Sequence, residues 1–254
     1  MGISDSVPIV SCPRPDAGVF ETILIWEDEA VELDAHLDRL AASSRTLFGA
    51  DPPDGRQLVL DHSRGGGVGR LRLDLRTTAG GALRESVIVA PFDRRNVFPA
   101  PPLGTDLASI VVDRGYGEHK WIDRDMLTRA EATVGPGVAP LLVGPDGTVF
   151  EASRANLFAV RDGLLLTPPL DGAILPGVAR AGVLAAATDL GVDRREERLD
   201  LDTLRGSAEV FLTGSLRGVE PVRSLDGAQF DLGGPVSAAL AAALKERWFG
   251  DAQR

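Results

Sequence analysis

The sequence predicts an α+β fold in two domains, and three observations lead to this prediction. Segments with strand and helix patterns are mixed without the strict alternation that a parallel βαβ sheet requires. Residues 91–105 are rich in proline and poor in periodicity, as a linker is. The chain has 254 residues and 44% hydrophobic content, enough for two domains with cores of their own. We expect one domain at 1–98 and a second at 99–254.

The first domain is expected to begin with a loose leader over residues 1–18, where turn formers and prolines gather. Residues 19–28 are rich in β-branched and aromatic types and predict a strand, with 30–33 returning as its hairpin partner. A helix follows, with apolar side chains at helical spacing. Asp34 is expected to cap it and Gly49 to end it.

A second hairpin closes this domain. Residues 70–78 alternate strictly between polar and apolar types, which indicates a half-buried strand. Residues 85–91 are expected to pair with it across the turn at Gly80-Gly81.

The second domain is expected to hold a strand meander and three helices, marked by turns such as Pro145-Asp146-Gly147. The patterns predict strands at 107–113, 140–144, 148–151, 156–160, 164–167, about 193–198, 208–213 and 219–225. They predict helices at about 121–134, 177–190 and 235–248.

Charge and cysteine content exclude several classes of protein. The net charge is −10 and the pI is about 4.8, which argues against a nucleic-acid-binding surface. A small anionic ligand stays compatible, since a local arginine and a helix N-terminus can bind one. The single cysteine, Cys12, cannot form an intramolecular disulfide and is expected to be a bystander thiol in a reducing cytoplasm. We expect no membrane span and no signal peptide, because the apolar runs are too short.

Lysine is rare in this chain. Of 27 lysine and arginine residues, only Lys120 and Lys245 are lysines. Lysine can become a neutral, nucleophilic amine and condense with an aldehyde, whereas arginine stays protonated. Lys120 is expected to open a helix in GEHKWIDR, where the cation of Arg124 would favour the neutral amine. The alternative is a GC-rich genome that leaves two lysines by chance.

Other segments carry residues suited to a phosphorylated pyridine aldehyde. Glu151 ends an expected strand, where a carboxylate could pair with a ring nitrogen; the alternative is a solvated strand end. Gly177 lies at a helix start, whose free N–H groups suit a phosphate; the alternative is a plain helix start. Thr213 and Ser215 lie in a turn that could also contact phosphate, although such turns are common. Arg39 could bind phosphate with two hydrogen bonds, or be a solvated helix residue.

Taken together, an ordered series of segments resembles the class-IV aminotransferase family. These fold-type IV pyridoxal-phosphate enzymes include branched-chain and D-amino-acid aminotransferases and 4-amino-4-deoxychorismate lyase. The resemblance covers residues 18–226 and is carried by FET (20–22), HLDRL (36–40), HK (119–120), EASRANLF (151–158), TPPLDGAILPGVAR (167–180) and FLTGSLRGVEPV (211–222). It implies a small N-terminal α/β domain, a larger C-terminal domain with a barrel-like sheet, and a homodimer.

The resemblance also implies a role for each matching residue around the ring of pyridoxal 5′-phosphate. Lys120 matches the lysine that bonds to the cofactor aldehyde and later acts as general base. Glu151 matches the partner of the pyridine nitrogen, and Leu175 the residue packed on the ring face. Asn156 matches an asparagine for which we expect a structural hydrogen-bonding role.

The phosphate of the cofactor has its own set of matching residues. Arg39 matches the phosphate-binding arginine of the N-terminal helix. Gly177 and Val178 match the backbone contacts, and Thr213 and Ser215 lie in the second phosphate-contacting loop.

Two activities share this scaffold. The run K-W-I-D-R after the lysine, with Arg124, is closer to the lyases, so 4-amino-4-deoxychorismate lyase, giving 4-aminobenzoate and pyruvate, is the first expectation. An amino-acid transaminase is the alternative, and a cofactor-binding protein without catalysis is a remote one. The substrate is expected to be a small amine, with Arg124, Arg154 and Arg217 as candidates for binding its carboxylate. The sequence PDAGVFET, where the family has a glycine-rich turn, weakens any transfer of substrate identity.

Other catalytic classes lack support in the sequence. GSLRG (214–218) does not have the spacing of a hydrolase nucleophile elbow. His36 is expected to be a helix residue, His62 a surface residue and His119 a neighbour of the lysine. These scattered histidines offer no ligand spacing, so no metal site is expected.

Overall fold

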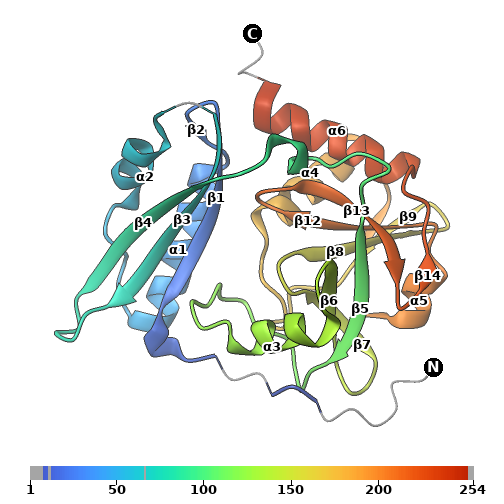
Figure 1. Cartoon of the computed structure of the whole chain (residues 1–254), viewed down its shortest axis with the longest axis horizontal. Coiled ribbons are helices and arrows are strands. Elements are labelled where there is room, and N and C mark those ends of the chain that lie inside the picture. Colours follow the sequence, from blue (N-terminus) through green and yellow to red (C-terminus); the bar gives the residue numbers. More distant parts are fainter. Residues whose placement is uncertain (1–7, 11–12, 66, 251–254) are drawn as a thin grey trace. The chain divides into compact units, whose positions relative to one another are not determined.

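The computed structural model of the protein describes residues 8–10, 13–65 and 67–250 (Figure 1). Cys12 lies outside the described residues. The chain divides into two compact units. The described residues of the smaller unit are 13–65, 67–97 and 119–124, and those of the larger unit are 8–10, 98–118 and 125–250. The segment 119–124 thus belongs to the smaller unit although it follows the expected linker in the sequence.

The smaller unit is an antiparallel sheet in the order β2-β1-β3-β4, with helices on it (Figure 1). Its elements are β1 (Val19–Trp26), β2 (Glu29–Ala30), α1 (Leu33–Phe48), α2 (Gly55–Ser63), β3 (Val68–Thr77) and β4 (Leu83–Pro91), with short 3₁₀ turns at Pro15–Ala17 and Arg94–Asn96. Strand period 2 sorts the side chains between two faces. Ile23 and its partner Leu71 are fully buried on the face that carries α1. Phe20 lies on the opposite face.

Local signals explain where this unit agrees with the sequence prediction and where it differs. Gly49 follows α1 with φ +69°, a conformation that favours glycine, so the predicted helix end is confirmed. The predicted cap was wrong: Glu32 is the N-cap, its side chain does not cap the helix, and Asp34 lies in the first turn. Helix α2 was not predicted, because it is short and largely polar. Its cap is the Asp54 side chain, which accepts from Arg56 N.

The larger unit contains a ten-stranded mixed sheet. Its strands are β5 (Thr105–Val111), β6 (Val138–Val143), β7 (Thr148–Ala152), β8 (Asn156–Arg161), β9 (Leu164–Thr167), β10 (Arg194–Glu196), β11 (Leu199–Asp200), β12 (Glu209–Gly214), β13 (Gly218–Leu225) and β14 (Ala228–Gln229). Its helices are α3 (Asp125–Val134), α4 (Val178–Asp189), α5 (Leu201–Arg205) and α6 (Pro235–Phe249). The strand order is β10-β9-β8-β12-β13-β5-β6-β7-β11, with β14 paired to β13.

Two apolar clusters pack against this sheet, one on each face. Alternate residues of β8 divide between the clusters, as strand geometry requires. Leu157 packs with side chains from both ends of the strand order, inside the curl of the sheet, so the expected barrel-like sheet is confirmed. Phe158 packs on the other face, where α4 and α6 cover the sheet and Phe211 stacks on it at 5.2 Å (Figure 1).

The predicted helix at 121–134 was wrong at its start, because α3 begins at Asp125. Residues before it form no helix and are bonded to the start of the smaller sheet: Phe20 N donates to Lys120 O at 2.9 Å, and Ile122 N donates to Gly18 O at 3.0 Å. Lys120 therefore lies on an added edge segment of the smaller sheet and does not open a helix. None of the helices in the described part of the chain is long and apolar enough to span a membrane.

Candidate active site

The backbone of β1 fixes the position of Lys120. The Lys120 carbonyl accepts from Phe20 N, Ile122 N donates to Gly18 O, and Trp121 between them forms a bridge with Val19, so the backbone has little freedom. The Lys120 side chain is half-buried, and its Nζ lies 4.9 Å from the centroid of the Phe20 ring. The structure thus gives the one internal lysine of the sequence a defined aromatic neighbour.

His119 provides a second anchor for the same segment. Its Nδ1 lies 3.0 Å from Oγ of Ser43 on α1, and its ring packs edge-on against Trp121 at 5.2 Å. The predicted role of His119 as a neighbour of the lysine is therefore a positional one: it ties the lysine segment to α1. Ser43 follows Arg39 by four residues, so both lie on one face of that helix.

Arg39 belongs to a buried polar cluster with Glu21 and His36. Arg39 Nε donates to Glu21 Oε1 at 2.8 Å and Nη2 donates to Oε2 at 2.6 Å, a two-bond pair. His36 Nδ1 lies 2.7 Å from Glu21 Oε2. The side chains of Arg39, Glu21 and His36 are 10%, 2% and 1% exposed. His36 is thus a helix residue, as predicted, and a deeply buried one.

The cluster sets the charge state of its members. Burial alone would raise the pKa of Glu21, but the charge of Arg39 and the hydrogen bonds from His36 and Arg39 outweigh it and bring the pKa to about 2. Burial lowers the pKa of His36, and the contact with Glu21 only partly offsets this effect. At neutral pH the cluster therefore holds an ionised Glu21 and a neutral His36.

Arg72 is a cation near Phe20 that the sequence did not single out. Its guanidinium carbon lies 3.8 Å from the centroid of the Phe20 ring, and its Nε donates to Asp74 at 2.5 Å. Lys120 Nζ and the Arg72 guanidinium thus both contact one aromatic ring. The alternation of residues 70–78 was a signal that could have found it, since it places every second residue, Arg72 among them, on the face of Phe20.

In the larger unit, Glu151 is held by Asn156 and Leu175. Asn156 Nδ2 donates to Glu151 Oε2 at 3.0 Å and to Leu175 O at 2.9 Å. Leu175 N lies 3.3 Å from both carboxylate oxygens of Glu151. Glu151 is 8% exposed, so it is no solvated strand end. The hydrogen-bonding role expected for Asn156 is present in this geometry.

Gly177 is the N-cap residue of α4, directly before Val178. A Cβ at Gly177 would come within 2.0 Å of Asn156 Oδ1, so glycine allows the helix start to pack on the asparagine. The first N–H groups of α4 have no acceptor within the helix and can donate to an anion. The residues from Glu151 to Val178 are thus connected by direct contacts through Asn156.

Thr213 lies beside Asn156, because the two residues are partners in the pairing of β12 with β8. The threonine is 2% exposed, and its Oγ1 has no hydrogen-bond partner in the described part of the chain. A buried hydroxyl without a partner is uncommon and indicates a ligand or a water. Ser215 follows at the end of β12, half-buried.

The three arginines expected to bind a carboxylate do not all belong to one unit. Arg154 forms a two-bond ion pair with Glu131, at 2.7 and 2.8 Å, and its side chain is 70% exposed. Arg217 is paired with Glu220. Arg124 is half-buried in the smaller unit. Arg154 and Arg217 thus each have a carboxylate partner within the chain.

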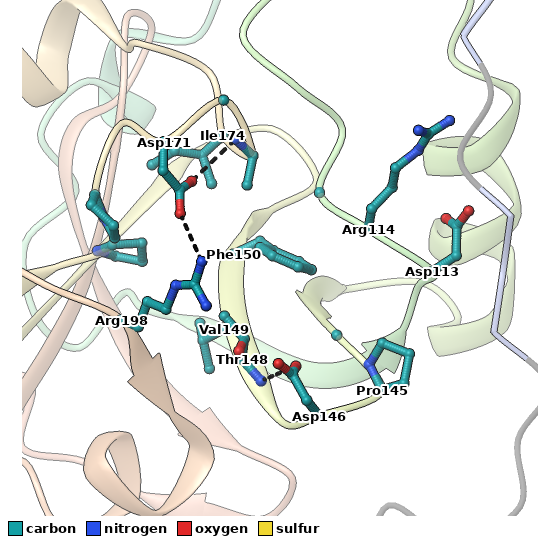
Figure 2. Close-up of a pocket in the computed structure, with 16 residues that line it drawn as sticks. Asp113, Arg114, Pro145, Asp146, Thr148, Val149, Phe150, Asp171, Ile174 and Arg198 are labelled. Atoms are coloured by element: carbon teal, nitrogen blue, oxygen red, sulfur yellow. Dashed lines mark hydrogen bonds and ion pairs between the residues drawn. The ribbon is translucent and has the colours of Figure 1, made fainter.

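A cavity of about 520 Å³ lies in the larger unit, next to Glu151 and Leu175 in the sequence (Figure 2). Its walls include Phe150 and Ile174, and the ion pair of Arg198 with Asp171 at 3.5 Å crosses one side. None of the residues expected in the cofactor site lines it.

Two glycines lead towards the lysine segment. Gly117 N donates to Ala173 O at 3.1 Å, and a Cβ on Gly115 would come within 1.9 Å of the same oxygen. The backbone that precedes Lys120 is therefore fastened to the backbone that precedes Leu175. Only glycine permits this approach at position 115.

Two features outside these groups complete the comparison with the sequence. His62 is exposed in the last turn of α2, as predicted. The residues that the structure describes include no group of three or more His, Cys, Asp or Glu side chains that could hold a metal ion.

Known proteins are similar to this chain in sequence and in fold. A family model described as amino-transferase class IV matches residues 18–225. The branched-chain-amino-acid aminotransferase of Salmonella typhimurium is 36% identical over 110 residues, which are 42% of this chain and 36% of that protein. The chain thus matches little more than a third of the length of that relative.

Similarity to solved structures extends over nearly the whole chain. The PLP-bound form of a hypothetical aminotransferase from Mycobacterium tuberculosis has a TM-score of 0.82 and 26% identity, covering 94% of this chain and 90% of that one. The 4-amino-4-deoxychorismate lyase of Pseudomonas aeruginosa has a TM-score of 0.77 and 25% identity, covering 91% of each chain.

Proposed function

Because the chain belongs to the amino-transferase class IV family, whose enzymes use pyridoxal 5′-phosphate, we propose that Lys120 holds this cofactor and removes a proton from the substrate. When bound, the cofactor withdraws electrons from the carbon that bears the substrate amine and so makes its proton acidic. Lys120 Nζ is the nucleophile for the cofactor aldehyde and, once released by the substrate amine, the base for that proton.

The residues of the larger unit fit the cofactor. Glu151 is a buried carboxylate held by two donors, suited to accept a hydrogen bond from the protonated pyridine nitrogen. Thr213 Oγ1 is buried without a partner among the described residues, so it is suited to donate to a phosphate oxygen. Gly177 and Val178 start a helix whose free N–H groups favour the same phosphate.

The remaining expected contacts are proposed from the resemblance. Leu175 is proposed to pack on the ring face, since its backbone is fixed to Glu151. Ser215 is proposed as a further phosphate contact near Thr213. Arg39 is proposed to bind the phosphate from the smaller unit.

For the reaction itself we favour 4-amino-4-deoxychorismate lyase. The observation that carries this preference is the pair of cations, Lys120 and Arg72, against the single ring of Phe20. A substrate with a flat ring, an amine and two carboxylates suits an aromatic surface with an added guanidinium. Lys120 would remove the proton next to the amine, the neighbouring C–O bond would break with its electron pair on oxygen, and the pyruvate enolate would leave and take up a proton on carbon. The products are 4-aminobenzoate and pyruvate.

An amino-acid transaminase is the second candidate. It is supported by the name of the Salmonella typhimurium relative, a branched-chain-amino-acid aminotransferase. The first proton removal by Lys120 is common to both reactions. They differ in the next step: in a transaminase Lys120 would return the proton, and the product released would be an oxo acid.

Two assays on the purified protein with pyridoxal phosphate distinguish the candidates. The first follows the visible absorption of the cofactor during titration with L- and D-amino acids, and the second measures pyruvate and 4-aminobenzoate released from aminodeoxychorismate. Release of both products, with no amino acid converting the cofactor to pyridoxamine phosphate, is expected. Conversion by an amino acid without product release would replace the lyase by the transaminase.

We also propose that the protein is a homodimer, as the resemblance implies. Light scattering of the holoenzyme after gel filtration tests this, with an expected mass twice the 26.8 kDa of the chain. A monomer mass would contradict it.

A further inference from the structure

Glu21 is an ionised carboxylate placed in a strand that is otherwise almost entirely apolar. We propose that Glu21 is a positioning residue for cofactor binding, which holds the Arg39 guanidinium in the orientation that receives the phosphate. The inference rests on the proposed function, in which Arg39 is the phosphate ligand. Glu21 acts through Arg39, and His36 fixes Glu21 in turn.

The geometry restricts the guanidinium strongly. Two hydrogen bonds from Nε and Nη2 to the two oxygens of Glu21 define the plane of the guanidinium as well as its position. They use one edge of the guanidinium, so the edge formed by Nη1 and Nη2 is turned away from Glu21. An arginine side chain normally loses rotamer freedom when it binds a ligand. Here Arg39 has lost that freedom already in the folded protein.

His36 contributes by occupying Glu21 without adding a charge. Its Nδ1 lies 2.7 Å from Glu21 Oε2, and the ring is 1% exposed. Since His36 is neutral at pH 7, the Nδ1–H tautomer donates to the carboxylate and leaves Arg39 as the only cation of the cluster. Glu21 is thereby fixed by donors on two sides.

The position of Glu21 in β1 connects the phosphate ligand with the lysine. Consecutive strand residues face opposite sides of a sheet. Glu21 faces α1 and holds Arg39, whereas Phe20 faces the other side, contacts the Lys120 amine and donates its N–H to Lys120 O. One dipeptide of β1 thus sets the positions of both groups that bind the cofactor in the smaller unit.

A simple charge argument predicts the opposite effect, which makes the proposal testable. The negative charge of Glu21 lies beside the arginine and repels a phosphate, so its removal alone would tighten phosphate binding. If Glu21 instead positions Arg39, removal of the carboxylate weakens binding. In Glu21→Gln the amide presents an NH₂ group to one of the arginine donors, and one of the two hydrogen bonds is lost.

The test compares two probes that differ only in the phosphate. Apoprotein variants are titrated with pyridoxal phosphate and with pyridoxal, and binding is followed by absorbance. For Glu21→Gln we expect roughly ten- to hundredfold weaker binding of pyridoxal phosphate, the effect of one charge-assisted hydrogen bond, and little change for pyridoxal. In the Arg39→Ala background the same substitution is expected to have no further effect on pyridoxal phosphate.

Two more variants keep the test decisive. Glu85→Gln is the matched control, because Glu85 lies in the same unit on β4, far in sequence from the cluster, and is expected to leave both affinities unchanged. Glu21→Asp keeps the charge but withdraws the carboxylate by one methylene. It is expected to reproduce the selective loss if Glu21→Gln does not fold, as judged by circular dichroism.

Each outcome has a separate meaning. If the unaltered protein does not bind pyridoxal phosphate, the proposed function is wrong. If it binds and Arg39→Ala weakens binding, but the Glu21 variants bind tighter, bind equally well, or lose pyridoxal and pyridoxal phosphate alike, only the positioning role is overturned.

Discussion

Replacing Gly177 by alanine places a methyl group where Asn156 now lies. The added Cβ would come within 2.0 Å of Asn156 Oδ1 and 3.3 Å of Arg180 Cβ. Real contacts of this kind are longer than about 3 Å, so the amide must move by roughly 1 Å. Asn156 is 4% exposed and fixed by its pairing with Thr213, so there is little space for this movement.

The cost can be worked out from the bonds that the amide makes. Movement of Asn156 breaks its hydrogen bonds to Glu151 Oε2 and to Leu175 O, at 3.0 and 2.9 Å. Each is worth about 1–1.5 kcal/mol. We therefore expect Gly177→Ala to lower the free energy of unfolding by about 2–3 kcal/mol. We also expect it to weaken the binding of pyridoxal phosphate by roughly tenfold or more, because Glu151 and the helix start move together.

Urea unfolding of the apoprotein and absorbance titration with pyridoxal phosphate measure the two effects. Gly233→Ala is the matched control in the same unit, since its Cβ would meet its nearest neighbour, Asp231, at an ordinary 3.5 Å. Unfolding and binding equal to those of the unaltered protein in Gly177→Ala would refute the reasoning, because the glycine would then have no packing role.

Three further predictions concern buried or half-buried carboxylates and are read from urea unfolding as a function of pH. Burial and the charge of Asp54 raise the pKa of Glu85 from 4.5 to about 7. The ionised group therefore lowers the stability of the folded protein increasingly as pH rises from 4.5 to 7. After allowance for the partial exposure of Glu85, the Glu85→Gln variant should be more stable than the unaltered protein by about 1–2 kcal/mol at pH 8, and a less stable variant would contradict this. The pKa of Glu21 is lowered from 4.5 to about 2, so its contribution to the free energy of unfolding is complete above pH 4.5 and is lost as pH falls towards 2. Glu21→Gln should therefore flatten the dependence of the unfolding free energy on pH between 4.5 and 2, and an unchanged slope would disprove this. Glu209 accepts from Val236 N and Ser237 N at 3.1 and 2.7 Å at the start of α6, and Glu209→Ala should cost about 2–4 kcal/mol, whereas a loss below 0.5 kcal/mol would show that water replaces the carboxylate.

Elements with a clear period were predictable from the sequence. The strand at 164–167 and the helix from 235 were expected within a residue or so of their observed bounds, because turns or prolines mark their ends. The sequence singled out Lys120, Glu151 and the helix start at Gly177 as site candidates because an amine, a carboxylate and free helix N–H groups suit the expected cofactor. These features are local, and a single sequence contains them.

The parts that depend on non-local pairing were harder to predict. The helix start was placed at 121 because the segment after Lys120 has helical composition, whereas its backbone bonds to β1, which lies about a hundred residues earlier. The role of Glu21 was missed for the same reason. Two signals could have revealed it: a carboxylate in an apolar strand, and His36 and Arg39 three residues apart on one helix face.

The central claim is that Lys120 bonds to pyridoxal phosphate. Borohydride reduction of the holoenzyme makes such a bond permanent, and peptide mass spectrometry then locates it. The chain offers an internal control, since Lys245 is exposed on α6 and is the only other lysine. We predict the cofactor mass on the peptide that contains Lys120 and none on the peptide of Lys245. A label on Lys245, or no label at all, would contradict the account.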